Sequence, residues 1–143
     1  MLAVMAGLTG LHHAALSVRD VDASSQWYRD VLGLHEEFRQ ESDARRMVVM
    51  RFPGLQHTLG LVEHKGAGDE FDPRQLGLDH LAFSVGSGEE LEAWPQRLDE
   101  RGVTHSGPIE TPFGGMLNFA DLDGIALALF WERGKDTPRR PER

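Results

Sequence analysis

Apolar and polar residues alternate along two segments that lie 67 residues apart in the chain. Residues 11–18 read Leu-His-His-Ala-Ala-Leu-Ser-Val, and residues 78–85 read Leu-Asp-His-Leu-Ala-Phe-Ser-Val. Both fit the pattern Leu-x-His-apolar-Ala-apolar-Ser-Val, and a period of two predicts a β-strand. The His, Ala and Ser of each strand should share one face: His13, Ala15 and Ser17, then His80, Ala82 and Ser84. The offset is close to half of the 143 residues, which indicates an internal repeat.

Each predicted strand precedes a segment with the apolar spacing of an amphipathic helix. Asp22 is the expected N-cap of the first helix, and Gly33 stands where that helix should end. Ser87 and Glu90 predict a capping box at the start of the second helix. Pro95 lies inside the second helix, where its missing N–H should kink the helix or restart it.

Short strand-like runs follow each predicted helix. The runs cover residues 34–39, 46–52 and 58–62 in the first half, and residues 103–106, 116–120 and 125–131 in the second half. Each half therefore reads β-α-β-β-β, which predicts an α+β fold built from two modules.

The predicted modules form one domain over residues 1–132. Module one should cover about 8–63, a linker rich in Gly, Asp and charged residues 64–77, and module two about 78–132. Residues 133–143 carry basic residues and two prolines without apolar periodicity, so we expect a solvated basic tail there.

Composition narrows the classes of partner. The chain has 23 acidic and 15 basic residues, a formal charge of −8, which argues against nucleic acid or an anionic membrane as a partner. Its apolar runs are shorter than the ~20 residues of a spanning helix, and residues 1–8 lack the basic start of a signal peptide. The absence of cysteine excludes disulfides and thiol nucleophiles. These features predict a cytoplasmic protein.

Four motifs, in their order and spacing, carry a family resemblance. They are His-Ala-Ala-Leu-Ser-Val-Arg-Asp (13–20), Trp-Tyr-Arg-Asp-Val-Leu-Gly-Leu (27–34), Gly-Leu-Asp-His-Leu-Ala-Phe-Ser-Val (77–85) and Asp-Leu-Asp-Gly-Ile-Ala-Leu-Ala-Leu-Phe (121–130). Together they resemble the vicinal oxygen chelate superfamily, which includes glyoxalase I, extradiol dioxygenases, fosfomycin resistance proteins and bleomycin-binding proteins. The resemblance implies two βαβββ modules that form a curled mixed sheet around an open cavity, and a homodimer.

The resemblance also implies positions for metal ligands. In metal-using members, the first strand of each module supplies a His, and last strands supply carboxylates. His13 and His80 match the two His positions, but Gly60 and Ala128 stand where the carboxylates would be. A Lewis-acid metal needs three or four protein ligands, so a bound Zn, Ni, Mn or Fe would need a third ligand besides these two histidines. The candidates for a third ligand are His12, Gln56, His57, Glu63, Glu110 and Glu132. None of them is well placed for that role.

Small and weakly polar side chains should line the cavity in the family register. The candidate ligand-binding residues are Ala15, Ser17, Gly60, Ala82, Ser84, Asn118, Ala128 and Phe130. Such a lining suits a flat or bulky apolar ligand, although small residues also let two sheets pack closely.

Three functions stay open. The first is a small-molecule-binding protein without a complete metal site or cofactor, whose ligand is an apolar or aromatic metabolite or antibiotic. The second is a divalent-metal-dependent lyase or dioxygenase that uses His13 and His80. The third is a metal-free isomerase or lyase in which one of these histidines acts as a general base, since the reference pKa of His is ~6.5. The missing carboxylates favour the first.

Overall fold

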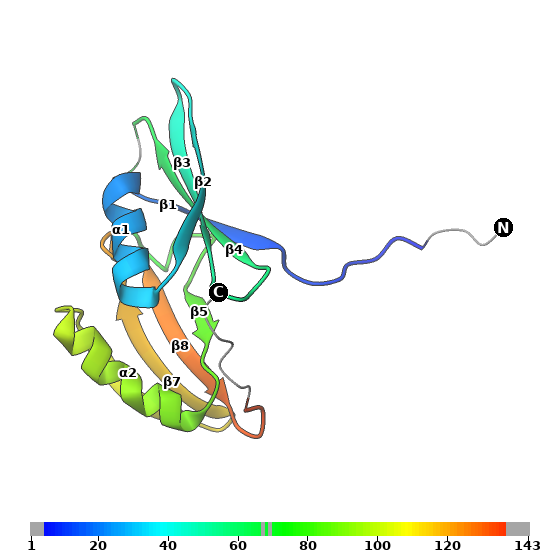
Figure 1. Ribbon diagram of the computed structural model, residues 1–143, viewed down its shortest axis with the longest axis vertical. Helices are drawn as coiled ribbons and strands as arrows, with labels where there is room; N and C mark the ends of the chain where they lie inside the picture. Colours follow the sequence, from blue (N-terminus) through cyan, green and yellow to red (C-terminus); the bar gives the residue numbers. More distant parts are fainter. Residues whose placement is uncertain (1–4, 67, 69, 137–143) are drawn as a thin grey trace.

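The computed structural model describes residues 5–66, 68 and 70–136 (Figure 1). Residues 1–4 and 137–143 lie outside the described residues, and with them lies most of the predicted basic tail. Among the described helices, none has both the length and the apolar character needed to cross a membrane.

Two βαβββ units follow one another along the chain. The elements are β1 (His13–Ser17), α1 (Val21–Leu32), β2 (His35–Glu41), β3 (Arg45–Arg51), β4 (Thr58–His64), β5 (Leu81–Ser84), α2 (Gly88–Glu100), β6 (His105–Thr111), β7 (Gly114–Ala120) and β8 (Ala126–Glu132). They form two four-stranded sheets, ordered β1-β4-β3-β2 and β5-β8-β7-β6. Each first strand runs parallel to the last strand of its unit, and the other neighbours are antiparallel. The predicted α+β class is confirmed, with two open mixed sheets.

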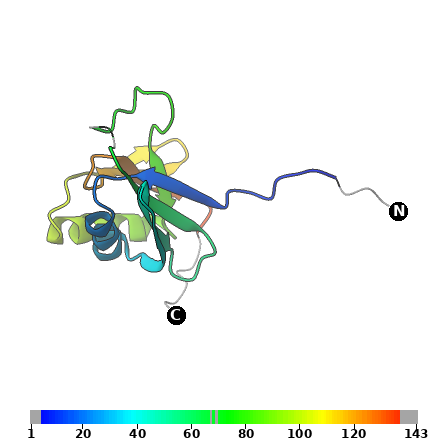
Figure 2. The ribbon, with the colours of Figure 1, turned by 90° about the horizontal axis from the view of Figure 1, so that it is seen from above.

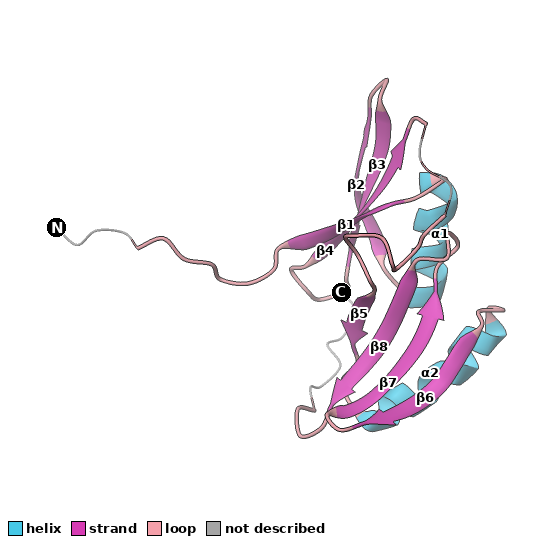
Figure 3. Cartoon of the chain, turned by 180° about the vertical axis from the view of Figure 1, so that it is seen from behind, coloured by secondary structure: helices cyan, strands magenta, loops and turns pink. Residues whose placement is uncertain are grey.

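Both helices cover the same side of the molecule. Helix α1 contacts β2, β3 and β4, whereas α2 contacts β6, β7 and β8. No described helix lies over the opposite face of the second sheet, which faces the viewer in Figure 3. The segment before β1 extends away from the body of the molecule (Figure 2). The arrangement follows from the alternation in each strand, because the apolar half of the side chains needs a helix to bury it.

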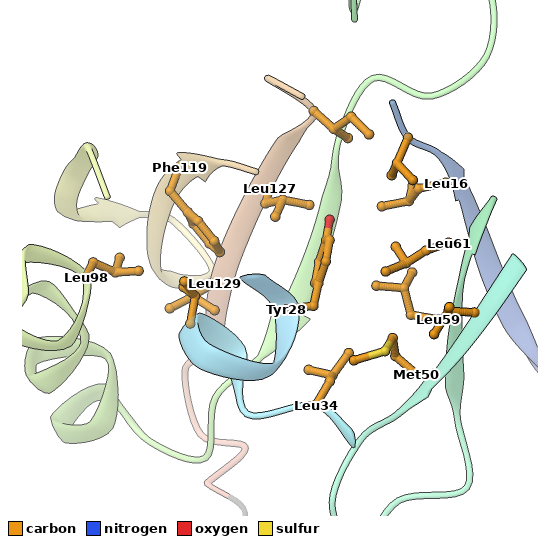
Figure 4. Close-up of a cluster of buried hydrophobic side chains, with 14 of the residues drawn as sticks. Leu16, Tyr28, Leu34, Met50, Leu59, Leu61, Leu98, Phe119, Leu127 and Leu129 are labelled. Carbon is orange, nitrogen blue, oxygen red and sulfur yellow. The ribbon is translucent and has the colours of Figure 1, made fainter. Parts of the chain in front are cut away.

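One apolar cluster runs through both units. The ring of Tyr28 is fully buried and lies between Leu127 of β8 and Leu59 and Leu61 of β4 (Figure 4). Trp27 stacks on Phe119 of β7 with ring centroids 6.3 Å apart. Helix α1 therefore buries apolar surface of both sheets, and the two units share a single core.

Polar contacts reinforce the joint between the units. The Tyr28 hydroxyl donates to Asp121 Oδ2 at 2.8 Å. Asp121 Oδ1 accepts from the backbone N–H groups of Asp123 and Ile125 at 2.9 and 3.0 Å. Burial raises the pKa of both the Asp121 carboxyl and the Tyr28 hydroxyl. The Asp-Leu-Asp-Gly-Ile turn before β8 is thus tied to α1 of the other unit.

Two arginines, Arg97 of α2 and Arg101 directly after it, bind the C-terminal end of α1. Arg97 Nε donates to the carbonyl of Val31 at 2.9 Å, and Arg101 Nε donates to that of Asp30 at 2.6 Å. The last carbonyls of a helix lack intrahelical donors and carry partial negative charge, so guanidinium groups stabilise this end.

The first helix begins earlier than predicted. Asp20 is its N-cap, with a side chain that accepts from the backbone N–H groups of Asp22 and Ala23. Naming Asp22 as the cap was wrong, because the buried side chain of Val21 belongs to the first helical turn and moves the cap outward. Gly33 ends the helix as predicted, with a left-handed φ of 76°.

The second unit also departs from its predicted boundaries. Strand β6 covers His105–Thr111 and so extends past the predicted end at residue 106. The strand can continue through Pro108 because it is an edge strand with a register shift between His105 and Pro108, where a missing N–H is tolerated. Helix α2 continues through Pro95 as one element, so of the two predicted effects, a kink or a restart, the restart does not occur. The Ser87 cap is confirmed, since its hydroxyl accepts from the Glu90 N–H at 3.1 Å.

Candidate functional site

The residues predicted to line a cavity lie on the sheet faces that point away from the helices. Ala15 pairs with Gly60 in the first sheet, and Ala82 and Asn118 flank Ala128 in the second. Residues paired in this way share a face. Ser17 and Ser84 occupy the equivalent next positions of β1 and β5, and Phe130 pairs with Ser84. The structure therefore divides the predicted lining between two sheet faces.

A cleft of about 430 Å³ lies at the edge strand β1. Ala15, Ser17 and Val18 form one wall, and Phe71 and Leu78 of the segment that joins the two units form another. Ile125, from the turn that binds α1, also lines the cleft. Two predicted ligand-binding residues, Ala15 and Ser17, thus belong to this cleft.

The sequence did not predict that the segment joining β4 and β5 lines the cleft. Phe71 and Leu76 are spaced neither as a strand nor as a helix, and the linker around them carries several charged and turn-forming residues. The detectable signal was these two large apolar side chains within the predicted linker, next to Leu78 at the start of the predicted strand.

Each predicted histidine ligand has a polar neighbour in sequence. The Nδ1 atoms of His12 and His13 lie 2.8 Å apart. His80 Nδ1 lies 2.7 Å from the Asp79 carboxylate, and the His80 side chain is 56% exposed. A carboxylate that accepts from Nδ1–H leaves Nε2 as the basic nitrogen. Asp79 is therefore an orienting partner for His80. This residue was visible in the Leu-Asp-His motif but was not assigned a role.

The residues present do not fit a metal centre with three protein ligands. In the described part of the chain, no three His, Asp or Glu side chains come together in a metal-binding group. A Cβ at Gly60 would lie 3.2 Å from the Cβ of Ala15, so β1 packs closely where a carboxylate side chain would begin. Ala128 offers no donor on the second face, and Glu63, considered as a third ligand, is ion-paired with Arg46.

Comparison with known proteins identifies the family. Residues 10–129 match the Glyoxalase/Bleomycin resistance protein/Dioxygenase superfamily, and the chain belongs to that superfamily. A solved glyoxylase/bleomycin resistance protein/dioxygenase domain from Frankia sp. EAN1pec is 38% identical. The match covers 89% of this chain and all of that domain, with a TM-score of 0.83. The resemblance seen in the sequence is confirmed.

One further relative and one solved structure of the same fold differ in what they bind or catalyse. A biphenyl-2,3-diol 1,2-dioxygenase from Rhodococcus globerulus is 28% identical over 121 residues, which are 83% of this chain and 61% of that enzyme. A fosfomycin resistance protein from Listeria monocytogenes, solved with Mn(II) and a dihydroxypropylphosphonic acid, is 22% identical. That match covers 86% of this chain and 90% of the other, with a TM-score of 0.65, and shows a shared fold.

Proposed function

We propose that this protein binds an apolar or aromatic small molecule, a metabolite or an antibiotic, in the cleft at the edge of β1. The observation that carries the proposal is the cleft itself. Its volume of about 430 Å³ lies within the range of small-molecule sites. Its walls combine the apolar side chains of Phe71 and Leu78 with the hydroxyl of Ser17.

The expected affinity is modest. A two-ring aromatic that buries roughly 250 Å² of apolar surface gains about 6 kcal/mol from its removal from water. Lost translational and rotational freedom offsets part of that gain, so we expect a Kd of roughly 100–1000 µM for such a generic ligand. A natural ligand that also bonds Ser17 would bind more tightly.

The repeat supplies a matched pair of variants for the test. Ser17 and Ser84 are equivalent positions, both side chains are exposed, and Ser17 lines the cleft whereas Ser84 lies on the face of the second sheet. In a fluorescence titration with N-phenyl-1-naphthylamine, Ser17→Trp should weaken binding at least about tenfold, because the indole fills the cleft. Ser84→Trp should bind as the wild type does. Absence of saturable binding to the wild type, or loss in Ser84→Trp alone, would refute the proposal.

A second candidate function rests on the contact between Asp79 and His80. The carboxylate orients the imidazole so that Nε2 can act as a general base, which supports a metal-free isomerase or lyase. For any compound found to bind, product formation followed by liquid chromatography, which separates isomers as well as cleavage products, should fall at least about tenfold in Asp79→Asn at unchanged affinity. Equal turnover in this variant and the wild type would reject the candidate.

A further inference from the structure

A second hollow adjoins the cleft at the end of the β2–β3 hairpin. This basic groove of about 610 Å³ lies where residues 42–46 meet the end of β4 and the chain that follows it. Arg19 and Gly68 line both the groove and the cleft. A single ligand can therefore extend from one into the other, past the Arg19 side chain.

The charges of the groove contrast with those of the whole chain. Among the residues that the structure describes, four cationic side chains and two carboxylates line it, in a protein of net charge −8. Glu63 is ion-paired with Arg46, which also binds Asp22, so this carboxylate is already compensated. Within the described residues, the exposed side chains of Arg45 and Lys65 take part in no ion pair, and they face the groove with Asp43.

Backbone hydrogen bonds fix the segments that carry these two cations. The Lys65 N–H donates to the carbonyl of Ala44 at 3.0 Å, and Arg45 pairs with His64 in the β3–β4 ladder. The Ser42 hydroxyl accepts from the N–H groups of Ala44 and Arg45, each at 3.3 Å. The two cations thus project from an ordered turn, which lowers the entropic cost of binding an anion there.

The cleft has acidic residues of its own, but two of them are compensated. Asp72 bonds the guanidinium of Arg74 at 3.0 Å, and Asp123 lies 3.6 Å from that of Arg19. Glu70 is exposed at the rim. The apolar walls therefore dominate the cleft, whereas uncompensated positive charge is found in the groove.

We infer that the ligand is an amphipathic organic anion. Its apolar body lies in the cleft, and its sulfonate, phosphate or carboxylate group lies in the basic groove near Arg45 and Lys65. This inference rests on the proposed function and adds the charge of the ligand to it.

Two dyes with the same ring skeleton separate the inference from the function on which it rests. 8-Anilinonaphthalene-1-sulfonate is N-phenyl-1-naphthylamine with one added sulfonate. The wild type should bind the sulfonate about fivefold more tightly than the neutral dye, and this preference should shrink in 0.5 M salt, because exposed charge interactions are weak and screened.

The double variant Arg45→Ala with Lys65→Ala should remove the preference and leave binding of the neutral dye unchanged. Arg133→Ala with Lys135→Ala removes the same net charge at the exposed end of β8, and it should keep the preference. Near-UV circular dichroism checks that each variant is folded.

Each failure points to one of the two proposals. Equal binding of both dyes, or a preference that survives in the groove variant, overturns the anionic ligand and leaves the cleft as a site. A preference lost equally in the control variant also overturns it, because the effect would then be general electrostatics. Failure of both dyes to bind the wild type overturns the proposed function itself.

Discussion

Tyr28→Phe removes one hydroxyl from the joint between the two units. In the wild type that hydroxyl donates to Asp121 at 2.8 Å, and the Asp121 residue is 8% exposed. The variant keeps the ring and its packing between the two sheets, so the change isolates the hydrogen bond. The two backbone donors to the other carboxylate oxygen remain.

The expected loss follows from the cost of a buried acceptor without its donor. Such a group costs about 1–3 kcal/mol, and a charged acceptor stands at the upper end of that range. Part of the penalty is avoided at acidic pH, because burial already raises the pKa of Asp121 and the protonated acid needs no donor at that oxygen. We therefore expect Tyr28→Phe to destabilise the protein by about 2 kcal/mol at pH 7, and by less as the pH falls through the raised pKa.

Urea unfolding followed by tryptophan fluorescence measures this loss. With a slope of roughly 2 kcal/mol per molar urea, the midpoint should fall by about 1 M. Ser25→Ala is the control, because the Ser25 hydroxyl donates to the carbonyl of Asp22 within the same helix, and we expect a loss below about 1 kcal/mol. A Tyr28→Phe midpoint within error of the wild type would refute the reasoning.

Three further predictions concern ionisation, metal binding and assembly. Tyr28 is the only tyrosine of the sequence, so absorbance at 295 nm should show no tyrosinate until the protein unfolds. Above pH ~10 the Tyr28 hydroxyl is deprotonated in the unfolded chain but not in the folded chain, so the free energy of unfolding should fall by about 1.4 kcal/mol per pH unit. Tyrosinate absorbance in folded protein at pH 10 would contradict this. Ala128→Glu places a carboxylate on the face shared with Ala82. Calorimetry should show an affinity for Mn(II) at least about tenfold above that of the wild type and of the control Ala128→Gln. No gain would mean that His13 and His80 do not act as metal ligands on that face. Sedimentation equilibrium should show the homodimer that the family resemblance implies, and a monomer at 100 µM would reject it.

Much of the fold could be predicted because the alternation of apolar and polar residues in each repeated strand determines which side chains are buried. The alternation around His13 and His80 fixed which side chains share a face, and the observed pairing of Ala82 with Ala128 agrees with it. Predicted element boundaries were wrong where the sequence pattern of a capping residue conflicted with the burial of a neighbouring side chain. Asp22 had the chemistry of an N-cap, yet the burial of Val21 made Asp20 the cap.

The joint between the units and the candidate site were harder to predict, because the parts of each are brought together by tertiary contacts. Tyr28 and Asp121 are 93 positions apart, and each alone is an ordinary core aromatic or turn aspartate. Phe71 lies in the predicted linker and Leu78 at the start of a predicted strand, and neither position marks the residue as the wall of a cleft. Asp79 was visible in the sequence, but its contact with His80 depends on side-chain orientation.

The location of the ligand is tested most directly by NMR. Amide chemical shifts of ¹⁵N-labelled protein titrated with N-phenyl-1-naphthylamine report every backbone position at once. Binding in the cleft predicts the largest changes at residues 15–19 and 71–78, with small changes at Ala82, Asn118 and Ala128. Changes concentrated at those last three residues, with residues 71–78 unaffected, would place the ligand on the open face of the second sheet and contradict the proposed site.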